Sequence, residues 1–125
     1  MSWSLNLFVD TQFGLEELAE ELGRLLGRKS ELTFNSDESL YELCDQSWCL
    51  SAGRHDLVND RDMKFETFPY QISIWSTSYP DWKVSQATCH ELANSLFDKF
   101  KTAGYRLLLT ENLQHKLRCY RKEIV

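Results

Sequence analysis

The chain has 125 residues, a net charge of −5, a hydrophobic fraction of 42% and an aromatic fraction of 13%. This composition excludes a disordered chain, and the negative charge argues against non-specific nucleic-acid binding, which needs a basic surface. A chain of this length buries a substantial core, and we expect one domain over residues 1–125.

A strand and an amphipathic helix are predicted at the N-terminus. Residues 3–9 begin with alternating apolar and polar side chains, which predicts a strand with Trp3, Leu5 and Leu7 on one face. Residues 15–26 place five leucines and an alanine at helical spacing, and residues 10–12 offer capping side chains. Gly27 is typical of the position after a helix, and Glu20 and Arg24 have the spacing of an ion pair.

Strands are predicted through the middle of the chain. Residues 30–35 form a short strand, and residues 40–50 fit an extended segment with an irregularity at 45–47, although part of their spacing is helical. Residues 53–62 form a polar loop or hairpin tip. Residues 64–78 form a strand whose first part is an edge or a bulge, because Pro69 cannot donate to a sheet ladder.

A second helix and a closing strand are predicted at the C-terminus. After a turn at residues 79–82, apolar residues recur at helical spacing over residues 85–103, with Ser85 as the N-cap and Gly104 as the terminator. Residues 105–110 form the closing strand. Residues 113–120 fit either a short helix or a final hairpin strand.

These elements predict an α+β fold. The best match is a two-layer sandwich of the ferredoxin-like β-α-β-β-α-β type, with an extra strand or a C-terminal helix. In that arrangement both helices cover one face of the sheet and the other face is open. Exposed aromatic side chains on the open face would mark a binding surface.

The cysteines and histidines predict no metal, cofactor or catalytic site. The chain starts with no basic segment and holds no apolar run of about 20 residues, so we expect a cytoplasmic protein that does not enter a membrane and has buried, reduced thiols. Two disulfides in an exported form are the alternative. Cys44, Cys49, His55 and the Cys89–His90 pair are spaced more loosely than structural zinc ligands. The adjacent side chains of Cys89 and His90 diverge on a helix, so we expect no enzyme.

The charge distribution predicts a protein-binding role. Residues 1–62 hold 13 acidic and 5 basic side chains (−8), and residues 63–125 hold 6 and 9 (+3). An acidic face steers basic partners, although an ordinary solvated surface is the alternative. The candidate partner-binding residues are Glu16, Glu17, Glu20, Glu21, Asp37, Glu38, Glu42, Asp45, Tyr79 and Trp82.

A small, acidic, aromatic-rich chain without catalytic motifs resembles the bacterial immunity proteins, which neutralise toxins by masking them. The resemblance covers size and surface chemistry, and it implies a non-enzymatic inhibitor that binds a basic protein and not nucleic acid. One alternative is a structural or assembly domain that forms a homodimer through its open sheet face. A small enzyme or ligand-sensing domain, which would gather His55 or His90 with a cysteine or carboxylate, is the other.

Overall fold

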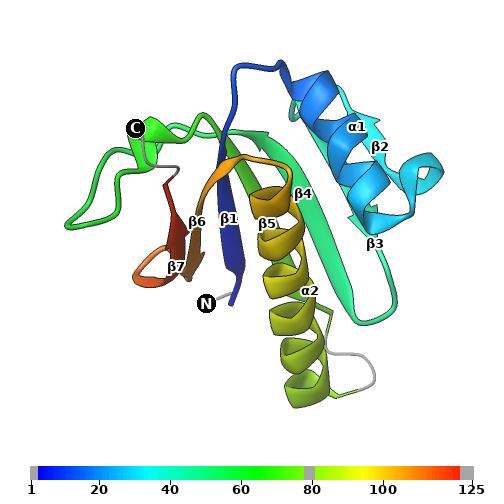
Figure 1. Ribbon diagram of the computed structural model, residues 1–125. Helices are drawn as coiled ribbons and strands as arrows, with labels where there is room; N and C mark the ends of the chain where they lie inside the picture. The colour runs from blue at the N-terminus through cyan, green and yellow to red at the C-terminus, as the bar shows by residue number, and fades with distance from the viewer. Residues whose placement is uncertain (1–2, 78–80, 122–125) are drawn as a thin grey trace.

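A single antiparallel sheet forms the centre of the molecule. The computed structural model describes residues 3–77 and 81–121, and in these ranges two α-helices and seven strands form (Figure 1). The elements in chain order are β1 (Leu5–Asp10), α1 (Leu15–Leu26), η1 (Lys29–Glu31), β2 (Thr33–Asn35), β3 (Leu40–Cys44), β4 (Trp48–Arg54), η2 (Phe65–Thr67), β5 (Tyr70–Ser76), α2 (Trp82–Thr102), β6 (Arg106–Glu111) and β7 (His115–Tyr120). The strand order is β2-β3-β4-β5-β1-β6-β7, and all neighbours are antiparallel.

The prediction of a ferredoxin-like β-α-β-β-α-β sandwich is wrong. The fold is mostly sheet, with seven strands and one helix between β5 and β6. Residues 40–50 supply two strands where one segment was expected, and residues 115–120 add another. In addition, α1 leads from β1 to β2, which have three strands between them in the sheet, so the chain crosses half the sheet instead of forming a compact βαβ unit.

Both helices cover the same face of the sheet, and the main core lies between them and the strands. α1 buries Leu18 and Leu22, and α2 buries Cys89, Ala93 and Leu96 against inward-facing side chains of β1, β4, β5 and β6. Figure 1 shows α1 over the β2–β3–β4 side of the sheet and α2 over its centre. The β2–β3 hairpin therefore lies beside α1, which positions the candidate site.

The predicted bounds of the first helix are confirmed, but its capping differs. Gly14 occupies the N-cap, and its backbone N–H donates to Glu17 Oε2 at 2.9 Å, so residues 10–12 do not cap this helix. Gly27 follows the helix with φ 69°, a left-handed conformation that glycine adopts at little cost. The second helix begins at Trp82, three residues before the predicted start. The Asp81 carboxylate caps it, and Ser85 is a buried helical residue.

Residues 64–69 do not form a strand. They follow a loop that begins after β4, contain η2 and end at Pro69, whose missing N–H is consistent with the strand beginning only at Tyr70. Phe65 and Phe68 of this segment and the preceding Met63 pack with Phe8 and Leu108 on the sheet face opposite the helices. The expected open face is therefore partly covered by the chain itself.

Residues 115–120 adopt the hairpin alternative. Asn112 and Leu113 have φ values of 53° and 60°, a pair of positive angles that turns the chain tightly between two strands. β7 pairs with β6 through a register shift next to Leu109 and Thr110, and it forms one edge of the sheet.

A polar row crosses the rest of the face opposite the helices, where Trp75 of β5 also lies half-buried. The row contains one polar residue from each of the seven strands, and each residue is the cross-strand partner of the next. These residues are Thr33, Glu42, Ser51, Ser73, Asn6, Thr110 and Lys116. Asn6 is buried there and its Oδ1 accepts hydrogen bonds from Gln71 Nε2 and Ser73 Oγ, both at 2.8 Å. The exposed aromatic side chain of Phe34 lies on the other face, because Phe34 pairs with Tyr41 and Tyr41 with the core residue Ala52.

The expectation of four reduced, buried thiols is wrong. Cys44 and Cys49 lie directly opposite each other on β3 and β4 and form a disulfide, Cys119 is exposed and free, and only Cys89 is a buried free thiol. The β3–β4 hairpin brings Cys44 and Cys49 together, which their spacing in the sequence did not reveal. In the described ranges, neither helix has the length and apolar character needed to cross a membrane.

Candidate protein-binding site

The N-terminal half of α1 presents an acidic surface. Leu18 and Leu22 fix the inward side of the helix, and Glu16, Glu17 and Glu20 are exposed on its other sides. Their placement follows from the 3.6-residue period of the helix, which turns these positions away from the leucine stripe.

A groove runs between this part of α1 and the β2–β3 hairpin. Its volume is about 190 Å³, and its lining residues are Glu16, Ala19, Glu20, Leu32 and Tyr41. Phe34 lies next to Tyr41, with ring centroids 5.0 Å apart, and the residue is 53% exposed. The groove therefore joins a carboxylate wall to an apolar and aromatic wall.

The two carboxylates that line the groove are not ion-paired. Glu16 and Glu20 are one helical turn apart, and within residues 3–77 and 81–121 no salt bridge reaches either of them. Like charges at this spacing destabilise a helix slightly. The predicted Glu20–Arg24 pair is wrong, because Arg24 binds Glu21 instead, at 2.5 Å. Two negative charges thus remain available to a partner.

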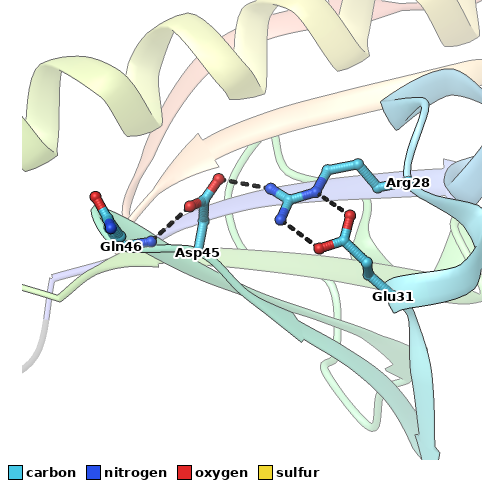
Figure 2. Close-up of polar contacts among 4 residues, drawn as sticks. All are labelled: Arg28, Glu31, Asp45 and Gln46. Carbon is cyan, nitrogen blue, oxygen red and sulfur yellow. Dashed lines mark hydrogen bonds and ion pairs between the residues drawn. The ribbon is translucent and has the colours of Figure 1, made fainter.

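The acidic side chains near the other end of α1 are already ion-paired with Arg28. Figure 2 shows Arg28 between Glu31, which it contacts at 2.7 Å through two nitrogens, and Asp45, which it contacts at 2.5 Å. Asp45 Oδ1 also accepts a hydrogen bond from the Gln46 backbone N–H at 2.7 Å, and the guanidinium lies 5.7 Å from the Trp48 ring centroid. This Arg28 cluster ties the end of α1 to the turn between β3 and β4.

The pKa values in the Arg28 cluster are shifted in the directions expected of ion pairs. Hydrogen bonding to Glu31 and Asp45 raises the pKa of Arg28. The pKa of Glu31 is lowered chiefly by its hydrogen bonds from Arg28, and that of Asp45 by the Gln46 backbone N–H and then by Arg28. Asp45 is therefore already engaged in an ion pair within the fold.

The remaining predicted residues do not gather at one site. Asp37 and Glu38 are exposed in the β2–β3 turn, and Glu42 faces the opposite side of the sheet, where Asn35 Nδ2 donates to it at 3.1 Å. Trp82 is 42% exposed at the start of α2 and packs edge-on against Trp3. Tyr79 lies outside the described residues.

Sequence reasoning missed the aromatic and aliphatic half of the groove. Leu32, Phe34 and Tyr41 look like ordinary strand residues, because alternation reveals a buried face but not which strand lies at the edge of the sheet. The short length of β2 and the polar turn at residues 36–39 are the signals that fit an edge hairpin.

In the described residues, His55 and His90 contact groups other than cysteine thiols. His55 Nε2 contacts the Phe68 carbonyl oxygen and its Nδ1 accepts from the Leu57 N–H, whereas His90 Nε2 lies 3.8 Å from Glu111. Burial raises the pKa of Cys89 to about 11, so its thiolate is scarce at neutral pH. Within the described ranges, no group of three or more His, Cys, Asp or Glu side chains is arranged to hold a metal ion.

Comparison with known proteins identifies no relative of this chain. No protein-family model, curated protein or solved structure gives a significant match to the chain. Its function must therefore be argued from the groove and its charges.

Proposed function

We propose that this protein is a non-enzymatic binding module that engages and masks a basic protein through the acidic side of α1, in the manner of an immunity-type inhibitor of a toxin. The observation that carries the proposal is a groove lined by two exposed acids, Glu16 and Glu20, which have no ion pair in the described residues. Tyr41 lines the same groove and packs against the exposed Phe34. Acidic surface charge steers a basic partner, and an adjacent aromatic side chain supplies apolar contact area.

Glu16 and Glu20 differ from the other exposed acids in lining this groove, and from many of them in having no ion pair in the described residues. Several other carboxylates are already ion-paired within the described chain, including Glu21, Glu31, Asp45, Asp62 and Asp98. Within the part of the chain that the structure describes, the acids lining the groove lack such pairing, so a partner's cations would not need to displace internal ones. A cytoplasmic location and the lack of a nucleic-acid partner belong to the same proposal.

Capture of the partner from host lysate tests the proposal, provided that a control variant carries the same change in net charge. The bait is the wild-type chain, and the test variant combines Glu16→Gln, Glu17→Gln and Glu20→Gln. The matched control combines Asp56→Asn, Asp60→Asn and Glu91→Gln, three exposed acids away from α1, and changes the net charge by the same amount. We expect the wild-type chain and the control to retain one basic protein at matched stoichiometry, and the α1 variant to lose it. Equal capture by all three baits would refute the proposal.

A homodimer through the sheet face opposite the helices is the second candidate. The polar row and the partial cover by residues 55–69 make this face less apolar than stable self-associating interfaces usually are. The mass of the chain in solution separates the candidates. Trp75 is half-buried on this face of β5, so a stable dimer that dissociates on Trp75→Ser would favour the sheet face, and a monomer would favour the free inhibitor.

A further inference from the structure

We propose that the groove between α1 and the β2–β3 hairpin accepts a single lysine or arginine side chain of the partner; this inference rests on the proposed function and specifies what its site recognises. The two walls differ in chemistry in the way that such a side chain requires. Glu16 and Glu20 offer carboxylates on one side, and Leu32 and Tyr41 offer apolar surface on the other.

The size of the groove fits one side chain better than a free small molecule. Its volume of about 190 Å³ lies below the roughly 300–1,000 Å³ of pockets that enclose small molecules. Lysine and arginine combine an aliphatic stem with a charged end, and they commonly lay the stem along apolar surface while the charge meets a polar partner. In this groove the stem would lie along Leu32 and Tyr41, and the charge would reach Glu16 and Glu20.

The aromatic pair at the rim favours a cation as well. Among the described residues, a basic side chain lies over an aromatic ring at four other positions, pairing Arg28 with Trp48, Arg54 with Tyr70, Lys101 with Tyr120 and Arg118 with Phe97. In the described part of the molecule no such cation stands over Phe34, which is exposed, or over Tyr41, which is half-buried. A cation within about 6 Å of a ring centroid is attracted to its face, so a partner's cation would gain this contact in addition to the carboxylates.

A peptide titration followed by backbone amide NMR tests the inference without the natural partner. The probes are acetyl-Gly-Lys-Gly-amide and acetyl-Gly-Arg-Gly-amide, and the matched neutral probe carries norleucine in place of lysine. We expect saturable shifts at Ala19, Leu32 and Tyr41 with both basic peptides and none with norleucine. Glu20→Gln should weaken the apparent affinity at least threefold, and Glu91→Gln, on the exposed side of α2, should leave it unchanged.

The outcomes separate this inference from the proposed function. Basic peptides that leave the groove resonances unmoved, or shift them equally in Glu20→Gln, overturn the side-chain site, while loss of lysate capture by the α1 variant would still uphold the inhibitor role. The opposite result is also informative. If the groove shifts depend on Glu20 but the α1 variant captures the basic protein as well as the wild-type chain does, the groove is not the site of the partner, and both the inference and the proposed function are overturned.

Discussion

At the C-terminal end of α1, Glu31 and Asp45 lie 2.7 and 2.5 Å from the Arg28 guanidinium, whereas at the N-terminal end Glu16 and Glu20 line a groove without an ion pair in the described part of the chain. Carboxylates of the same kind therefore have different surroundings at the two ends of α1. Acids paired inside the molecule stabilise the fold, and acids left unpaired beside apolar surface are available for recognition. This comparison predicts that changes at the two ends separate stability from binding.

The largest stability effect is expected on opening the Cys44–Cys49 disulfide, which closes the β3–β4 hairpin that Arg28 contacts. Replacing both cysteines with serine should lower the free energy of unfolding by about 2 kcal/mol, a low value for a disulfide because the closed loop is short. Groove binding should persist, because Tyr41 is still held between Phe34 and Ala52. Urea unfolding and the peptide titration measure the two quantities.

The control for this change is Cys119→Ser, which alters an exposed free thiol and should leave stability unchanged. Equal unfolding midpoints for the double variant and the wild-type chain, with the wild-type chain shown oxidised by thiol titration, would contradict a stabilising role for the disulfide.

Arg28→Gln is expected to have the next largest effect. It removes two hydrogen bonds to Glu31, the ion pair with Asp45 and the contact with Trp48, and the side chain is only partly exposed. We expect a loss of about 1 kcal/mol in unfolding free energy, with affinity for the lysine peptide changed less than twofold. Arg24→Gln, which breaks only the exposed pair with Glu21, should cost clearly less. Equal losses for the two variants would show that the Arg28 cluster is no more than a surface pair.

Acid should remove part of the Arg28 effect. The pKa values of Glu31 and Asp45 are lowered in the folded protein from their ordinary values of 4.5 and 3.8. Their stabilisation is therefore complete above those ordinary values and is lost as the pH falls through the lower folded-state values. The stability difference between the wild-type chain and Arg28→Gln should be largest above pH 5 and shrink steadily below pH 4.5. Urea unfolding from pH 7 to pH 3 measures it, and a constant difference over that range would contradict the assignment.

The sequence allowed the local elements to be predicted better than their assembly. Periodicity gave residues 15–26 as a helix, because the leucine stripe is a local property, and it marked residues 105–110 as a strand. It did not reveal that β1 lies between β5 and β6, since strand order depends on long-range packing that a local pattern does not encode. Extra strands at residues 40–54 and 115–120 then turned the expected sandwich into a seven-stranded sheet.

The same division holds for the site. The exposure of Glu16 and Glu20 followed from the helical period, but the use of Asp45 by Arg28 did not, because these residues meet only through the fold. Phe34 and Tyr41 were missed for a similar reason. Their place on an edge hairpin beside α1 depends on strand order, and a strand pattern has the same appearance at the centre of a sheet and at its edge.

The smallest predicted stability effect is also the sharpest test of the comparison, because its sign is opposite to that of the changes at the other end of α1. Glu20→Gln removes the repulsion between Glu20 and Glu16, one turn apart, without breaking an ion pair in the described residues. The variant should therefore gain about 0.3 kcal/mol in unfolding free energy while its affinity for the lysine peptide falls. Paired urea titrations at low ionic strength measure the gain, and 0.5 M salt should reduce it because it is electrostatic. A variant that loses stability would mean that Glu20 supports the fold as Asp45 does, and the two ends of α1 would then not differ in use.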